Sequence, residues 1–239
     1  MTGWEPDWFA AAAPLRADLW RAVEAQHRIA TMRLADSAAE QAVLERLLEA
    51  SKPPLPPAAR GLSYLLNTPF RYLSPWPSRF RAAGAAGVWY GAEHIATACA
   101  EVGYWRWRFL MDSDGLRDGN LFVEFTVFQA RADGTAIDLT SPPWSAAQPL
   151  WGHASDYSAC HGLAAAALER RIRWIRYASV RDPEQGLCGV VLDVGALSLP
   201  VPTLQQTWAA RVQRNCVIFS HDDATLEFRA EPWSTGAVA

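Results

Sequence analysis

The chain has 239 residues, of which 50% are apolar and 20% are charged. This length and apolar content suffice for one large domain with a sizeable core, and they exclude a chain that is disordered throughout. The net charge of −3 and the pI near 6.0 argue against a protein held on nucleic acid by bulk positive charge, although they leave a local basic patch open. We expect no direct nucleic-acid partner.

The N-terminus begins with acidic residues before a short alanine run, "MTGWEPDWFAAAAPLRADLW", and lacks the basic start of a signal peptide. No apolar run approaches the roughly 18 residues that span a bilayer. The four cysteines, Cys99, Cys160, Cys188 and Cys216, form no CxxC pair, which favours reduced thiols over disulfides. We therefore expect a soluble, cytoplasmic protein with no membrane partner.

Residues 14–30 are predicted to form the first helix, because apolar residues recur at nearly helical spacing. These residues are Leu15, Leu19, Val23 and Ile29.

A second helix is predicted to begin after Ser37, which forms a capping-box pattern with Glu40. Its expected buried stripe consists of Val43, Leu44, Leu47 and Leu48. The proline-rich "SKPPLPPAARG" at 51–61 then indicates a stiff connector. We therefore expect a helical N-terminal extension over residues 1–60 and a main domain over 61–239.

In the main domain, predicted strands outnumber predicted helices and do not alternate strictly with them. Helices are expected over 93–110, with Ile95, Ala98, Cys99 and Val102 facing inward, and after a cap at Ser155 or Asp156. The alternating "LFVEFTVFQA" at 121–130 predicts a strand, and "WIRYASV", "CGVVLD", "NCVIFS" and "TLEFRA" predict four more. This order favours an α+β fold with a mixed or antiparallel sheet.

The stretch "SRFRAAGAAGVWYGAE" at 78–93 combines the residue types of a nucleotide site. Glycine lets a ligand approach the backbone, the guanidinium groups of Arg79 and Arg81 suit phosphates, and Tyr90 offers a flat face to a ring. The alternative is an ordinary turn with surface arginines and a packed tyrosine.

Two other kinds of site are not supported by the sequence. His153, Asp156, Cys160 and His161 lie close together, but the adjacent positions 160 and 161 face different directions on a helix, and no zinc-type spacing accompanies them. There is also no G-x-G-x-x-G before a helix and no P-loop. We therefore expect no metal, and no nucleotide binding of the Rossmann type.

The ordered set Arg79, Gly84, Tyr90, Glu101 and Ser179, within "RFRAAG", "VWYGAE" and "IRYASVRDP", resembles the RES domain family, which is named for an arginine, a glutamate and a serine. The resemblance extends from about residue 66 to about residue 194, and the segment before it is similar to an extension in one subgroup. Either Arg79 or Arg81 is the named arginine, and the spacing to Gly84 favours Arg79.

The resemblance implies a compact fold similar to the ADP-ribosyltransferase toxins. It further implies the toxin of a bacterial toxin–antitoxin pair, neutralised by an Xre-type antitoxin that blocks the NAD cleft. The toxin would consume NAD as a substrate by breaking the nicotinamide–ribose bond. ADP-ribose would pass to phosphate as the first choice, to a protein side chain as the second, or to water. A non-catalytic nucleotide-binding or partner-binding module on the same fold is the alternative.

The residues of this pattern suit that chemistry. Because nicotinamide leaves as a neutral ring, the difficulty lies in the cation that develops on the ribose, and the carboxylate of Glu101 would stabilise it. Arg79 would bind the pyrophosphate or a ribose hydroxyl, and Tyr90 the nicotinamide. Ser179, at a strand end, would bind the ribose or the amide. The further substrate-binding candidates are Arg71, Tyr72 and Arg81.

Overall fold

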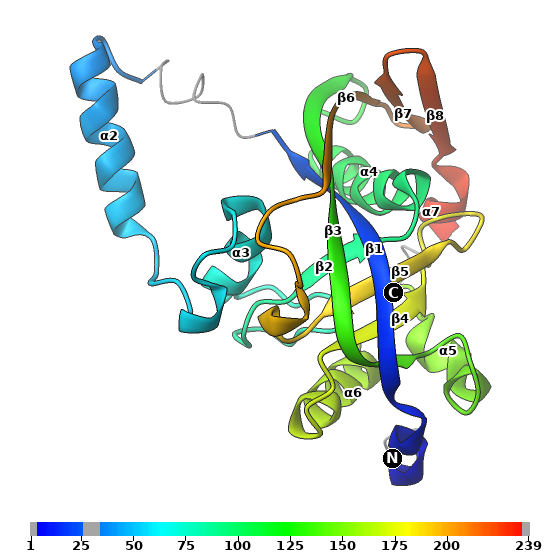
Figure 1. Cartoon of the computed structure of the whole chain (residues 1–239). Helices are drawn as coiled ribbons and strands as arrows, with labels where there is room; N and C mark the ends of the chain where they lie inside the picture. Colours follow the sequence, from blue (N-terminus) through cyan, green and yellow to red (C-terminus); the bar gives the residue numbers. More distant parts are fainter. Residues whose placement is uncertain (1–3, 26–33, 236–239) are drawn as a thin grey trace.

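The structure, a computed structural model, describes residues 4–25 and 34–235. They form an eight-stranded sheet in the order β1-β2-β5-β4-β3-β6-β7-β8, with helices packed around it (Figure 1). The strands are β1 (Ala13–Glu24), β2 (Trp89–Ala92), β3 (Leu121–Asp138), β4 (Trp174–Ala178), β5 (Leu187–Val191), β6 (Leu204–Val212), β7 (Cys216–His221) and β8 (Ala224–Arg229). Among the pairings that the structure describes, β3 with β4 is parallel and the others are antiparallel. The expected α+β fold with a mixed sheet is confirmed.

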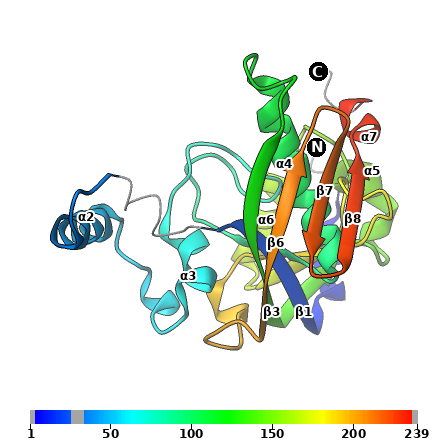
Figure 2. The ribbon, with the colours of Figure 1, turned by 90° about the horizontal axis from the view of Figure 1, so that it is seen from above.

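The α-helices are α2 (Ala38–Ser51), α3 (Tyr64–Arg71), α4 (Ile95–Asp112), α5 (Gln148–Trp151), α6 (Ser158–Glu169) and α7 (Glu231–Thr235). Four short 3₁₀-helices join them: η1 (Pro6–Ala11), η2 (Pro57–Ala59), η3 (Trp144–Ala147) and η4 (Val194–Ala196). Figure 2 shows α4 behind the neighbouring strands β3, β6, β7 and β8, with α2 set apart from the rest of the chain.

The long strand β3 organises the sheet. It pairs with β1 from Ala13↔Ala136 to Glu24↔Phe125. Its opposite edge pairs with β6 along residues 121–129 and with β4 along residues 136–138. Because β1 also contacts β2 at Trp20↔Ala92, the pairings of β1, β2, β5, β4 and β3 form a closed ring.

Three apolar clusters fill the space between the sheet and the helices. One joins α6 and the segment 144–151 to β4 and β5, a second joins α4 to β3, β6, β7 and β8, and the third joins α3 to β1, β2 and β3. The site described below lies where the first two clusters approach β1, because Trp20 of β1 packs against both.

The predicted helix over residues 14–30 is wrong for its described part, which is the strand β1. A spacing of four fits a strand as well as a helix, so Leu15, Leu19 and Val23 share one face of β1 and pack in the third cluster. Ile29 lies outside the described residues. Because β1 pairs with β3 in the main sheet, residues 13–24 do not belong to a helical extension, contrary to the expectation for residues 1–60. The boundary at residues 60 and 61 stays a prediction.

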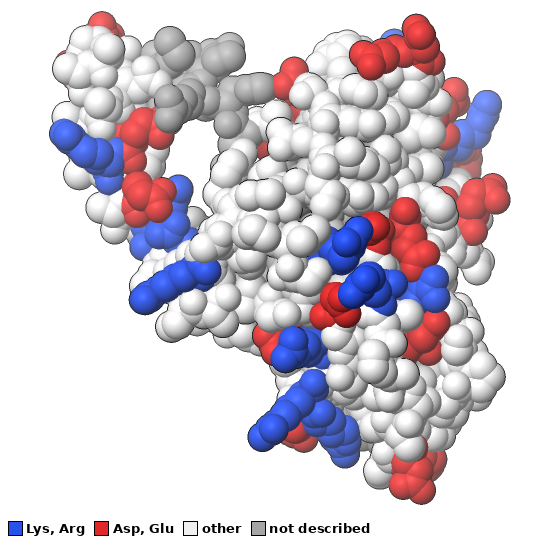
Figure 3. All heavy atoms as spheres, viewed as in Figure 1, with Lys and Arg blue, Asp and Glu red and all other residues white. Residues whose placement is uncertain are grey.

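The start of α2 is confirmed, whereas its expected buried stripe is wrong. Ser37 Oγ accepts the hydrogen bond from Glu40 N at 3.2 Å, as a capping residue does. None of the residues of α2 is buried, and the side chain of Leu47 is 62% exposed. The helix stands away from the sheet, and Figure 3 shows that the space between them stays open when all atoms are drawn.

The other predicted elements begin within a few residues of their expected places, and the strand expected over 121–130 continues to Asp138 as β3. The helix expected over 93–110 is α4, and the strands expected from "WIRYASV", "CGVVLD", "NCVIFS" and "TLEFRA" are β4, β5, β7 and β8. α6 begins at Ser158 with Tyr157 as its N-cap residue, so the expected cap at Ser155 or Asp156 is wrong, although Asp156 Oδ1 accepts from Ser158 N at 2.9 Å. β2, β6 and α3 were not predicted. Cys99, Cys160 and Cys188 are buried free thiols, and Cys216 is half-buried.

In the described part of the chain, no helix is both long and apolar enough to cross a bilayer.

Candidate functional site

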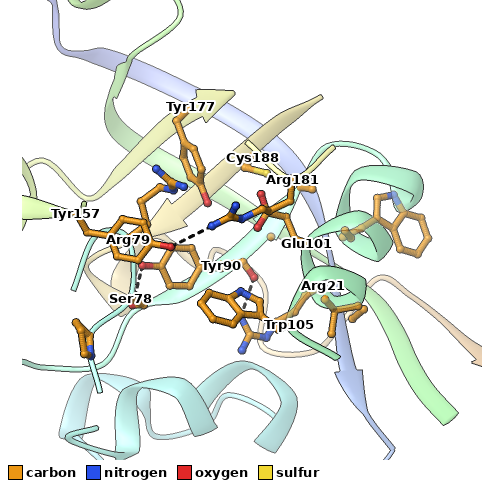
Figure 4. Close-up of a pocket in the computed structure, with 17 residues that line it drawn as sticks. Arg21, Ser78, Arg79, Tyr90, Glu101, Trp105, Tyr157, Tyr177, Arg181 and Cys188 are labelled. Carbon is orange, nitrogen blue, oxygen red and sulfur yellow. Dashed lines mark hydrogen bonds between the residues drawn. The ribbon is translucent and has the colours of Figure 1, made fainter. Parts of the chain in front are cut away.

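A cavity of about 400 Å³ opens between α4, β1 and β2 (Figure 4). This volume lies within the usual range of small-molecule sites. Its lining comes from segments that are far apart in the chain: residues 20–22, 77–79, 90–92, 98, 101, 102, 105, 157, 177, 181 and 188. Only the tertiary fold brings these segments together.

Glu101 lines this cavity from the second turn of α4. Its carboxylate accepts a hydrogen bond from Ser179 Oγ at 2.5 Å. Burial raises the pKa of Glu101, while the Ser179 hydrogen bond and the charges of Arg79 and Arg181 oppose that rise. The hydroxyl of Ser179 and the two nearby cations therefore offset part of the cost of burying the ionised carboxylate.

Ser179 lies behind Glu101 and is not part of the cavity wall. Its hydroxyl accepts from Arg181 N at 3.1 Å and from Asp182 N at 3.0 Å. With these two donors in place, the hydroxyl proton points to Glu101. The side chain is 2% exposed, so it acts on the cavity through the carboxylate.

Arg79 lines the cavity and is held on its outer side by backbone carbonyls. Nη1 donates to Trp151 O at 2.8 Å and to His153 O at 2.9 Å. The guanidinium carbon lies 4.8 Å from the centre of the Tyr157 ring. Between Arg79 and Arg81, it is Arg79 that the structure brings to the cavity.

Tyr90 lines the cavity and also fixes the neighbouring turn. Its hydroxyl lies 2.9 Å from Ser78 Oγ and accepts from Phe80 N at 2.9 Å. Burial raises the pKa of Tyr90 to about 12, so the phenol stays neutral. The ring is thereby held in place beside the turn that carries Arg79.

Arg181 is a cavity residue that the sequence reasoning missed. It is 5% exposed, and its guanidinium carbon lies 3.7 Å from the centre of the Tyr104 ring. Nη2 donates to Ala154 O and lies 3.5 Å from Tyr157 Oη (Figure 4). The signal was available, because Arg181 stands two residues after Ser179 in "IRYASVRDP".

Arg21 is a second missed cavity residue, and it was missed because β1 was expected to be a helix. Its Nη1 donates to Tyr90 O at 2.8 Å, while its buried Nε has no hydrogen-bond partner. No carboxylate among the described residues pairs with it, and burial lowers its pKa to about 10. Figure 4 shows it beside Trp105, which is 50% exposed on the cavity wall.

The structure does not bring Arg71, Tyr72 or Arg81 into the cavity wall. Arg71 donates to Glu49 Oε1 at 2.8 Å and to Pro53 O at 2.5 Å, and so ties α3 to α2. Tyr72 follows α3 and is exposed. Arg81 donates to Trp76 O at 2.7 Å within its own turn.

The residues considered for a metal site are engaged otherwise. His153 Nδ1 accepts from Asp156 N at 2.8 Å, and His161 Nε2 lies 2.8 Å from Ser78 O. Burial raises the pKa of Cys160 to about 11. Across residues 4–25 and 34–235, no three or more His, Cys, Asp or Glu side chains are grouped to hold a metal ion.

The charges on the cavity wall suit an anionic ligand. Arg21, Arg79 and Arg181 face a single lining carboxylate, Glu101, so the described lining has a net charge of +2 when that group is ionised. The whole chain has a net charge of −3. On the face seen in Figure 3, Lys and Arg side chains lie among Asp and Glu, without a large area of one sign. The described lining of the cavity is therefore positive, although the chain as a whole is negative.

Comparisons with known proteins identify the larger part of the chain. The family model of the RES domain matches residues 55–228. A search of curated proteins found no match. Among solved structures, a chain in the crystal structure of the M. tuberculosis MbcT–MbcA toxin–antitoxin complex is similar, with 11% identity and a TM-score of 0.48. That alignment covers 98% of this chain and 99% of the other.

Proposed function

The chain belongs to the RES domain family, and from that premise we propose that it is the toxin of a bacterial toxin–antitoxin pair. The proposed reaction breaks the nicotinamide–ribose bond of NAD and transfers ADP-ribose to an acceptor. The observation that carries this proposal is the cavity in which Arg79, Tyr90 and Glu101 lie together, with Ser179 directly behind Glu101. These residues were selected from sequence by their order and spacing.

Glu101 has the surroundings that the bond cleavage requires. When the C1′–N bond breaks, its electron pair leaves with nicotinamide, and positive charge develops on the ribose. A fixed carboxylate beside the ribose stabilises that charge, and losing such a preorganised group typically costs about 10²–10³ in rate. The Ser179 hydrogen bond holds the Glu101 carboxylate in one orientation, so little reorganisation is needed during the reaction.

The arginines would bind the anionic part of the substrate. At neutral pH, the pyrophosphate of a dinucleotide has two negative charges, which match the net charge of the described lining. Arg79 and Arg181 lie beside Tyr157, whereas Arg21 lies beside Trp105 (Figure 4). Arg21 has no ion-pair partner among the described residues, so a phosphate would supply its missing counter-charge.

Tyr90 supports the placement of the nicotinamide ring. Because its hydroxyl is bound to the turn at residues 78–80, the aromatic ring cannot turn freely away from the cavity. A flat ring that stacks on a fixed aromatic face loses little further freedom in the protein.

The acceptor completes the atom balance. An oxygen of inorganic phosphate forms the new bond to C1′, and the products are nicotinamide and ADP-ribose joined to phosphate. Water or a protein hydroxyl would form the same bond and release a proton. Phosphate is our first choice and a protein side chain our second.

The decisive experiment follows nicotinamide release from NAD by the purified protein, with and without inorganic phosphate. We expect release by the wild type, and a loss of about 10²–10³ in Glu101→Gln. Acceleration by phosphate supports phosphate as the acceptor. Absence of release, or equal rates in wild type and Glu101→Gln, contradicts the reaction. Calorimetry that showed NAD binding without turnover would instead support the non-catalytic binding module.

The partner is proposed from the resemblance to RES toxins. An Xre-type antitoxin would insert a segment into the cavity and exclude NAD. Expression of the chain alone should stop bacterial growth, and expression of Glu101→Gln or co-expression with a neighbouring helix-turn-helix protein should restore it. Growth that continues with the active wild-type protein present would contradict the toxin role.

A further inference from the structure

The N-terminal segment around η1 packs against residues 144–153, which comprise η3, α5 and the two residues after them and are called the loop below. The carbonyls of this loop hold Arg79, and η1 lies outside the residues matched by the family model. Trp8 and Phe9 contact the ring of Trp144 edge-on, with centroid distances of 5.5 Å and 5.0 Å. The ring of Trp4 lies 6.1 Å from that of Trp151. Three N-terminal rings thus cover two tryptophans of one short segment.

The segment that contains Trp144 and Trp151 ends at the carbonyls that anchor Arg79. Trp151 Nε1 donates to Trp144 O at 3.0 Å, which joins the two tryptophans into one unit. Arg79 Nη1 donates to Trp151 O and His153 O at 2.8 Å and 2.9 Å. A shift of the Trp144–Trp151 unit therefore moves the acceptors that define the position of this guanidinium.

The N-terminal rings are also fixed on their other side. A Cβ atom added at Gly162 of α6 would lie 3.1 Å from the Trp4 ring, so this glycine leaves room for the indole. The Arg170 guanidinium lies 4.4 Å from the centre of the Phe9 ring. Trp144 is consequently 1% exposed. The N-terminal segment therefore packs both against the loop and against α6 and the residues that follow it.

We propose that Trp4, Trp8 and Phe9 are positioning residues for the substrate-binding guanidinium of Arg79. They do not line the cavity. They act through Trp144 and Trp151, whose place they determine. An error of about 1 Å in a binding group can cost about a hundredfold in rate, so a small movement of this loop is sufficient for a large kinetic effect. The kinetic part of this inference rests on the proposed function.

A double-mutant cycle tests the path through Arg79. Trp8→Ala is expected to lower kcat/KM for NAD by about tenfold in the wild-type background, and by less than about twofold in the Arg79→Gln background. Equal factors in both backgrounds would show that Trp8 acts by some other route and would overturn the proposal. If Trp8→Ala does not fold, Trp4→Ala takes its place, because it removes the contact with Trp151.

Two control variants separate positioning from general stability. Trp8→Phe keeps an aromatic edge against Trp144 and should restore kcat/KM to within about threefold of wild type. Trp208→Ala removes an indole that is 4% exposed and stacks on His221, outside the cavity and the loop. It should lower the melting temperature without changing kcat/KM where the protein is folded. If Trp208→Ala lowered kcat/KM as much as Trp8→Ala does, the effect of Trp8→Ala would be explained by lost stability, and the positioning role would be refuted.

Hydrogen exchange gives a readout that needs no turnover. Trp8→Ala should speed amide exchange in residues 144–153 and leave exchange in β7 unchanged. If the wild type releases no nicotinamide, the proposed reaction fails, while exchange still decides whether the N-terminal rings fix the loop. Unchanged exchange in residues 144–153 would overturn the inference.

Discussion

Replacing Ser179 with alanine isolates the role of the hydroxyl behind Glu101. The variant removes the donor that lies 2.5 Å from the Glu101 carboxylate. It also leaves the buried N–H groups of Arg181 and Asp182 without their acceptor. Because the hydroxyl touches the carboxylate and does not line the cavity, we expect its loss to change the ionisation of Glu101 more than the binding of substrate.

The size of the effect follows from the hydrogen bond. A hydrogen bond to a charged group contributes about 1.5–3 kcal/mol, and each 1.4 kcal/mol is a factor of ten. The Ser179 hydrogen bond lowers the pKa of Glu101 against the effect of burial, so its removal raises that pKa further. On the acid side of the pH profile, where only the ionised fraction is active, the rate should fall by about tenfold to a hundredfold. At high pH the two rates should converge to within a few fold.

The assay is the pH dependence of nicotinamide release, measured where thermal unfolding shows that Ser179→Ala is folded. Ser220→Ala, at an exposed position of β7, is the matched control and should reproduce the wild-type profile. A Ser179→Ala profile with its acid limb unmoved and an increased KM would refute this reasoning, because it would make Ser179 a substrate contact.

The remaining predictions concern charge in and around the cavity. Burial raises the pKa of Glu101 in the folded protein above its ordinary value of 4.5. The protonated Glu101 side chain therefore contributes stability below pH 4.5, and this contribution is lost as the pH rises through the raised pKa. In thermal unfolding, Glu101→Gln should therefore gain stability relative to wild type as the pH rises from about 4 to about 8, and Glu227→Gln on the exposed face of β8 is the control. A difference in stability that stays constant over this range would contradict this. Arg21→Gln should raise KM for NAD about tenfold or more, since it removes a charge-assisted contact to phosphate, and an unchanged KM would exclude that role. Arg71→Ala should keep kcat/KM within about twofold of wild type, because this exposed ion pair lies outside the cavity wall, and a large loss would restore Arg71 as a site residue.

The opposite signs expected for activity and stability in Glu101→Gln have a common cause. Desolvation penalises the ionised carboxylate in the folded protein, and the same desolvation strengthens its interaction with a developing positive charge. A variant that is more stable and inactive would therefore support both the burial of Glu101 and its proposed role.

Local features of the sequence were sufficient for several elements and for the order of the candidate residues. Ser37 caps α2 because the hydrogen bond to Glu40 N joins residues three apart. The alternation in "LFVEFTVFQA" predicts β3 because side chains on a strand alternate between its two faces. The spacing of Arg79, Tyr90, Glu101 and Ser179 supported the RES resemblance without any knowledge of their contacts.

Only the tertiary structure decided what depends on partners distant in the chain. Leu15, Leu19 and Val23 fit either a helix or a strand, and the pairing of β1 with β3 determines that they form a strand. That strand brings Arg21 into the cavity, whereas α3 places Arg71 outside the cavity wall, where it pairs with Glu49. The periodicity of a sequence shows which residues share one face of a helix or strand. Whether another element covers that face, or leaves it exposed as in α2, depends on contacts between segments far apart in the chain.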